Sequence, residues 1–550
     1  MPELSEFSRH YNDFLDGEYD CVDRIVLSAY FPLGVTPGGF RTWWNTLEGT
    51  EEGLDNNHLM RMAGRFSRRL RAYAGAHGIP VIDCERGERK HEIAETYIPT
   101  DQKFRGVFLI MVNRSPANIW DVQRSNAGNI ANISHKKTMP YVNHYSFHIM
   151  DLEWGHVTIK MCGHPPFNAM IMLNGHEYVA SQAGKEGIEF AKTGNCFTTI
   201  SNAARLGELA DTLCSENTVG LLSQVCNRWI YSSCLYFALN TQEQQQSGFH
   251  YRYSVIQMEY SRNFIFTRGR VMDEIFNGTV DRTRSKLNVE SIKTIFGNKH
   301  RPFNRKDAKS STRFENKVET PTYDLTVFKI NYDKITAKMY TKGESVLRTE
   351  VVVHNSKQLK CGKSLEKYPQ MAIKLKDILN QFMNALYYID SSFVSSDAID
   401  TLNTPSLLGK TKIGGIDIQK PRMRAVLESV IILSAKPDGF NLSDLSKKVQ
   451  LILGDSEYSI RNAAYDLRKL RGKSIVEKIE NSRRYVTIPE GLQTITALLV
   501  IRDKVIKPVL SGVCKPKRGS KPKNRSAVDI HYENICGEME KLFQTIGIAV

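Results

Sequence analysis

The spacing of apolar residues predicts a mixture of helices and strands in the first 140 residues. A helix is expected from about 55 to 78, because apolar side chains recur there every three or four positions after Asp55, a residue type that caps helices. Short apolar runs at 79–84 and 107–112 are typical of buried strands, with a short helix between them. The long helix has an apolar face made of Leu59, Met62, Phe66, Leu70 and Tyr73, and arginines toward the opposite face, namely Arg61, Arg65, Arg68 and Arg69.

Between 140 and 300 the pattern changes from strands to helices and back to a strand. The runs 144–150 and 156–162, joined by the loop 151–155, predict a β-hairpin. Helical spacing follows at 176–193, 198–212 and 216–239, and a strand is expected at 251–260.

A polar, basic segment at 297–318 has no hydrophobic period and marks a boundary. After it, three runs rich in β-branched residues between 323 and 355 predict an antiparallel meander, and a helix is expected at 370–390. The fold class is therefore multidomain α/β and α+β. The expected divisions are an N-terminal α/β region at 1–300 that can divide near 120–140, a basic linker at 301–320, an α+β middle domain at 321–408, a further domain at 421–508, and a basic linker and tail at 511–550.

The order of elements at 421–508 is the strongest signal in the chain. A helix opening at Pro421 is followed by a turn, a short helix capped by Ser443, and a third helix at 457–471. Two strands joined at Asn481-Ser482 come next, and Pro489 opens a last helix. Three helices followed by a hairpin resemble the winged-helix-turn-helix family of DNA-binding domains, over less than a fifth of the chain.

The resemblance implies that the third helix reads duplex DNA and that the hairpin meets phosphate or the minor groove. The span 461–484 holds eight Lys or Arg and three acids, which suits that role. The residues expected to be buried are Ile460, Ala464, Leu467 and Leu470. The nucleic-acid candidates are Ser459, Arg461, Asn462, Tyr465, Arg468, Lys469, Arg483 and Arg484, together with Arg61, Arg65 and Arg68 of the N-terminal helix. The alternative is a solvated basic face on a protein-docking module.

Composition agrees with a nucleic-acid partner. Lys and Arg outnumber Asp and Glu by 74 to 59 in 550 residues, a formal net charge of +15. No apolar run approaches the roughly 20 residues that span a bilayer, and the polar, acidic start is not a targeting segment, so no membrane partner is expected. Ten cysteines without a CxxC pair argue against a disulfide framework and a zinc ribbon. A cytoplasmic protein is expected, nucleoid-associated if bacterial.

Five of the 14 histidines lie within 33 residues. Strand parity places His144 and His148 on one face of the hairpin, with His156 and Cys162 across from them on the same face. Imidazole and thiolate are usual zinc ligands, and imidazole with carboxylate suits other divalent ions, so these four residues are the candidate metal site for Zn, Mg or Mn. The simplest alternative is packing and hydrogen bonding within a polar sheet face.

A catalytic histidine must reach solvent, and two members of the cluster are expected in accessible positions. His164 follows in a loop, and His176 opens a helix, where either could act as general base beside a divalent ion. The acidic segment from Asp83 to Glu92 is interpreted as a charge-paired loop. In the meander, Arg348 and Glu350 share a face, and Tyr340 is interpreted as packing at the edge of the core.

The sequence thus predicts a duplex-DNA-binding protein, such as a regulator or a component of a mobile-element or replication system. One alternative is a divalent-metal-dependent nuclease or recombinase targeted by the C-terminal domain. Another is a structured-RNA-binding protein, with the arginine helix contacting phosphates.

Overall fold

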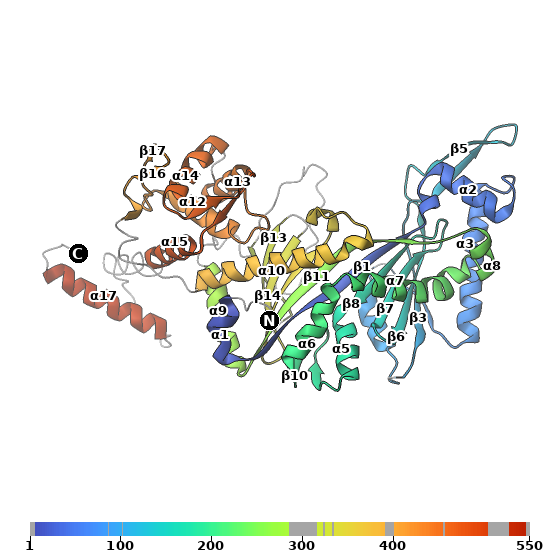
Figure 1. The fold of residues 1–550 in the computed structure, drawn as a ribbon, viewed down its shortest axis with the longest axis horizontal. Coiled ribbons are helices and arrows are strands. Elements are labelled where there is room, and N and C mark those ends of the chain that lie inside the picture. The colour runs from blue at the N-terminus through green and yellow to red at the C-terminus, as the bar shows by residue number, and fades with distance from the viewer. Residues whose placement is uncertain are drawn as a thin grey trace. The chain divides into compact units, whose positions relative to one another are not determined.

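The computed structural model describes residues 6–85, 87–101, 103–284, 316–322, 325–332, 335–390, 401–454, 457–503 and 527–545 (Figure 1). The chain forms two compact units. One, the sheet unit, consists of residues 14–269 and 333–379. The other, the C-terminal unit, consists of residues 380–550 together with 1–13 and 270–332.

One large mixed sheet organises the sheet unit. Its strands in this unit lie in the order β14-β15-β11-β1-β8-β7-β6-β3-β2. Neighbouring strands from β14 to β3 pair antiparallel, and β2 pairs parallel with β3. The bounds of these strands are β1 Leu15–Tyr30, β2 Val81–Asp83, β3 Gly106–Pro116, β6 Tyr141–Asp151, β7 Gly155–Cys162, β8 Ala169–Asn174, β11 Arg252–Phe266, β14 Ile335–Lys342 and β15 Val346–Val353.

Helices and two small hairpins complete this unit. Their bounds are α2 Pro37–Glu48, α3 Asn56–Ala76, α4 Lys90–Thr96, α5 Gly175–Lys185, α6 Ala203–Asp211, α7 Asn217–Trp229, the π-helical turn Ile230–Cys234 and α8 Thr241–Gln246, with hairpins β4 Trp120–Arg124 and β5 Ile130–His135, and β9 Phe190–Lys192 and β10 Phe197–Ile200. Residues 368–379 of α10 (Tyr368–Asp390) also belong here.

Local sequence explains the elements that were predicted. Asp55 caps α3 by accepting a hydrogen bond from the backbone N–H of His58, and the apolar residues on one side of the helix are buried, with Tyr73 the exception. In β6, Tyr145, Phe147 and Ile149 alternate into the core, as expected for a strand with one polar face. Trp43 and Trp44 of α2 are fully buried.

The structure corrects the expected domain boundaries. β15 pairs along its length with β11, so the last two strands of the predicted meander extend the sheet of the N-terminal region and do not form a middle domain at 321–408. The predicted helix at 176–193 ends at Lys185, and the hairpin β9–β10 follows it. The pairing of strands that are distant in sequence depends on tertiary packing, so the local pattern of apolar residues does not predict it.

The C-terminal unit is mainly helical in its described part. Its elements are α1 Glu6–Tyr11, α9 Gly269–Arg284 (from residue 270 on), β12 Asn316–Thr322, β13 Leu325–Tyr332, β16 Ser406–Leu408, β17 Thr411–Ile413, α12 Pro421–Leu433, α13 Leu442–Leu453, α14 Ile460–Gly472, β18 Val476–Lys478, β19 Tyr485–Thr487, α15 Pro489–Ile501 and α17 Ala527–Thr545. Most of the predicted linker at 301–320 and the basic run 515–525 lie outside the described residues. No helix in the described part of the chain has the length and apolar character to cross a bilayer.

The predicted order of three helices, a hairpin and a further helix is present as α12, α13, α14, β18–β19 and α15. The cap of α13 is Asn441 and not Ser443, because Asn441 and Asp444 exchange side-chain hydrogen bonds with each other's backbone. Gly439 has a left-handed φ of 72°, and a Cβ there would lie 2.5 Å from the carbonyl oxygen of Tyr485. This glycine therefore lets the turn before α13 pack against β19.

Candidate functional site

The basic face of α14 and the following hairpin is the candidate nucleic-acid interface. Ser459 caps the helix by accepting a hydrogen bond from the backbone N–H of Asn462. Arg461 and Arg468 are exposed, and the ammonium of Lys469 lies 5.0 Å from the ring centre of Tyr465. All of these predicted residues therefore fall on or beside one exposed helix face, apart from Ser459, whose hydroxyl is engaged in capping.

The opposite face of α14 differs in two positions from the prediction. Ala463, Asp466, Leu467 and Leu470 are buried, whereas Ile460 is 54% exposed and Ala464 is half-buried. Relative to the expected packing, the helix is rotated about its own axis, so that Ala463 lies in the core and Ile460 does not.

Asp466 positions α14, and the sequence reasoning missed it. Its carboxylate is almost fully buried, receives a hydrogen bond from the Tyr458 hydroxyl at 2.9 Å, and pairs with the Arg422 guanidinium of α12 at 2.8 Å. Burial and the neighbouring carboxylate raise the pKa of Tyr458, so that its hydroxyl remains a donor. A lone acid inside a basic helix was the available signal, since a buried acid needs cationic or hydroxyl partners.

The two arginines of the hairpin have different environments. Arg483 is exposed. Arg484 donates hydrogen bonds to the carbonyl oxygens of Asp438 and Gly439, at 3.3 and 3.0 Å, and so ties the hairpin to the turn before α13. Arg483 is thus the hairpin residue available to a ligand, while Arg484 holds the hairpin in place.

The arginines of α3 also separate into two kinds. Arg61 and Arg68 are exposed. Arg65 pairs with Glu243 at 3.0 Å and donates to the Ala238 carbonyl at 3.1 Å, and Arg69 lies 3.5 Å from the same carboxylate. Arg65, predicted to contact phosphate, is thus already paired with the carboxylate of Glu243, 178 positions away.

The predicted histidine hairpin is present as β6 and β7, but it does not bring its four candidate ligands together. His144 stands opposite Cys162, and the ring nitrogens of His148 and His156 are 3.0 Å apart, on the same sheet face. Four residues along a strand span about 13 Å, so the two pairs are too far apart to share one ion. Among the described residues, no three His, Cys, Asp or Glu side chains come together as metal ligands, which corrects the predicted metal site at His144, His148, His156 and Cys162.

The two predicted catalytic histidines are buried and not accessible. His164 is 3% exposed, and its Nδ1 contacts the carbonyl oxygen of Pro165 at 3.2 Å. Burial lowers its pKa. His176 is fully buried in the first turn of α5 beside Asp23. Glycine at 175 permits this position, because a Cβ there would lie 1.9 Å from the carbonyl oxygen of Val22 in β1.

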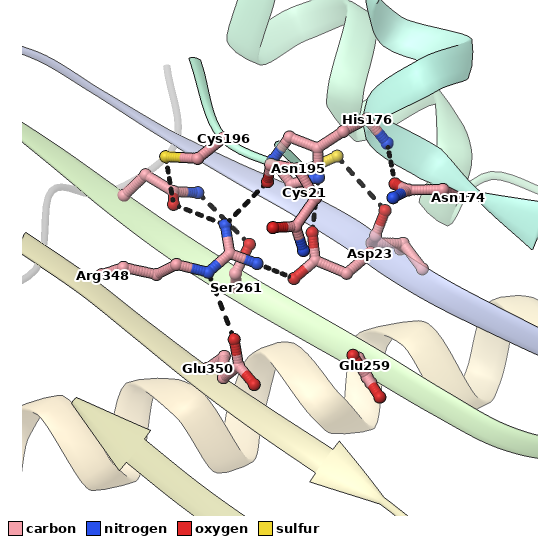
Figure 2. Close-up of polar contacts among 12 residues, drawn as sticks. Cys21, Asp23, Asn174, His176, Asn195, Cys196, Glu259, Ser261, Arg348 and Glu350 are labelled. Carbon is pink, nitrogen blue, oxygen red and sulfur yellow. Dashed lines mark hydrogen bonds and ion pairs between the residues drawn. The ribbon is translucent and has the colours of Figure 1, made fainter. Parts of the chain in front are cut away.

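His176 belongs to a network of buried polar side chains on β1, β11 and β15, shown in Figure 2. The guanidinium of Arg348 lies at its centre and is fully buried. It donates to both Asp23 and Glu350, and also to the Asn263 side chain at 2.9 Å and the Asn195 carbonyl at 3.1 Å. The predicted shared face of Arg348 and Glu350 is confirmed, with an Nε–Oε2 distance of 3.2 Å.

The network continues from β15 to β14, the neighbouring strand of the sheet. Glu350 accepts hydrogen bonds from Lys338 at 2.6 Å and from the Tyr340 hydroxyl at 2.7 Å. Burial opposes ionisation of Glu350, but Arg348 and Lys338 lower its pKa to about 2. Tyr340, interpreted from sequence as packing, is therefore a hydrogen-bonding member of the network. The carboxylates and cations satisfy one another, which is the arrangement that buried charges require.

The acidic segment 83–92 is charge-paired, as predicted. Asp83 pairs with Arg71 at 2.7 Å, and Glu92 pairs with Arg89 at 2.6 Å.

Comparisons of the chain with protein-family models, with curated proteins and with solved structures found no match.

Proposed function

We propose that the chain is a duplex-DNA-binding protein and that residues 421–508 act as a winged helix. The observation that carries the proposal is the exposure of Arg461, Arg468 and Arg483 on α14 and the hairpin, while the other side of α14 is buried against its own module. Such a helix can enter the major groove, and the hairpin arginine can meet the sugar–phosphate backbone.

Charge supports the same partner. The span 461–484 has a surplus of five basic residues, in a chain whose formal net charge is +15. Arg and Asn are the side chains that pair with guanine and adenine edges, and both stand at the start of α14 as Arg461 and Asn462. The metal-dependent nuclease alternative relied on His164, His176 and the four-ligand set, which the structure does not bring together, so the proposal contains no catalytic step.

The test measures binding of the full chain to a random-sequence 30-base-pair duplex and to an RNA duplex of the same length, by fluorescence anisotropy at increasing salt. DNA affinity is expected to fall steeply with salt, because bound cations release counterions from phosphate. Arg461→Ala should weaken DNA binding through the loss of a base contact. Arg483→Ala should weaken binding and reduce the salt dependence, since each phosphate contact contributes to the slope.

Arg205→Ala is the matched control, because Arg205 is an exposed arginine of the sheet unit already paired with Glu186 and Glu208. It should leave binding unchanged. DNA binding that is absent or insensitive to salt, or equal loss in the control, would contradict the proposal. Tighter binding to the RNA duplex would favour the structured-RNA alternative in its place.

A further inference from the structure

Ile460, the first residue of α14, is an apolar side chain in an unusual place. It is 54% exposed, although the apolar pattern of the helix placed it among the residues expected to be buried. Isolated exposed apolar residues are common and need no explanation by themselves. Its neighbours make this position informative.

The surroundings of Ile460 combine apolar and cationic groups. Ala464 lies one turn further along the same side of the helix and is half-buried. Tyr465 is 52% exposed, and Arg461 and Arg468 are exposed beside it. Ile460 and Ala464 thus form an apolar strip with two arginines beside it. Such a strip suits a polyanion that itself carries small apolar groups. An apolar protein partner would instead have to remove water from both guanidinium groups, which is unfavourable.

The major groove of DNA offers one apolar group, the C5-methyl group of thymine. Residues at the N-terminal end of a groove-bound helix are the ones that approach the base edges. We propose that Ile460 contacts thymine methyl groups and makes the protein select thymine in its target. The inference rests on the proposed DNA binding and adds a base preference and the residue that sets it.

The experiment begins with duplexes selected by the full chain from a random-sequence pool. The selected duplex is then synthesised twice, once with thymine and once with uracil at every thymine position, which removes the methyl groups and keeps the hydrogen-bonding edges. Wild-type protein should bind the uracil duplex about fourfold more weakly for each methyl group contacted, the factor expected for losing one buried carbon.

Ile460→Ala should bind both duplexes with the same affinity, close to that of the wild type for the uracil duplex. Leu451→Ala is the matched control, because Leu451 of α13 is also an aliphatic residue, 69% exposed, in the same module. It should keep the wild-type preference for thymine. Circular dichroism melting of each variant checks that the fold is retained.

The outcomes separate the two proposals. Equal affinity of the wild type for the thymine and uracil duplexes, or a thymine preference that survives in Ile460→Ala, overturns the role of Ile460 and leaves DNA binding intact. Failure of the full chain to bind any duplex overturns both. Loss of the preference in Leu451→Ala as well would assign the effect to the module and not to Ile460, which also overturns the inference.

Discussion

At the scale of single residues, Arg348 places a fully buried positive charge inside the sheet unit. Its charge is fully buried, and its partners Asp23 and Glu350 are buried with it. A buried ion pair contributes little net stability compared with apolar packing, but removing one member leaves a charge without compensation. The network therefore acts as a structural constraint on which strands can lie beside one another.

We expect Arg348→Met to lower the free energy of unfolding by about 3–5 kcal/mol, because Asp23 and Glu350 would remain buried without their cation. The measurement is the midpoint of urea unfolding followed by circular dichroism. Arg205→Met serves as the control, since the exposed partners of Arg205 are hydrated when it is lost. An unchanged midpoint in Arg348→Met would show that the network does not stabilise the sheet.

At the scale of elements, the start of α5 depends on one close backbone approach. Gly175 follows the cap residue Asn174 and lies against the carbonyl of Val22, so that His176 reaches Asp23. Gly175→Ala should lower the stability by about 1–3 kcal/mol, the usual cost of forcing extra volume into a packed site. Gly184, in the same helix, has open space around its Cβ direction.

Gly184→Ala is therefore the internal control for this prediction. It should leave the stability unchanged or slightly higher, because alanine favours helix over glycine. Thermal and urea unfolding of both variants gives the comparison. If the two variants had equal stability, the contact between α5 and β1 would not be the reason for glycine at 175.

At the scale of the whole molecule, the buried histidines tie stability to pH. Burial lowers the pKa of His144, His148, His156 and His164, and burial together with His156 lowers the pKa of His148 to about 4. The unfolded chain binds protons on these groups near the usual value of 6.5, where the folded chain does not. Stability is thus complete above about pH 6.5 and is lost as the pH falls toward 4.

His148→Gln should reduce this pH dependence, because glutamine takes up no proton. Between pH 7.5 and pH 4.5 the wild type should lose more stability than the variant, by an amount on the order of 1–3 kcal/mol. Urea midpoints at each pH measure the difference. His91→Gln, which changes an exposed histidine, should follow the wild-type curve. Parallel curves for wild type and His148→Gln would contradict the prediction.

The sequence by itself determined many of the local elements and, for α3, most of the apolar face. The cap at Asp55 and the apolar spacing after it predicted α3, and the runs on either side of residues 151–155 predicted the hairpin of β6 and β7. The order of elements from Pro421 onward was also readable, because each helix has its own capping or proline signal. These features depend on residues close in the chain, whose interactions repeat with the period of the helix or strand.

Only the tertiary structure decided which distant side chains meet. Arg348 reaches Asp23, 325 positions away, because β15 pairs with β11 and β11 pairs with β1. Glu243 likewise forms an ion pair with Arg65, a residue far from it in the sequence. Burial in the folded chain removes His164 and His176 from solvent. The exposure of Ile460 likewise follows from which residues of α14 fill the core. Burial and pairing depend on how whole elements pack, and the same local pattern is compatible with several packings, so these properties became visible only in the folded chain.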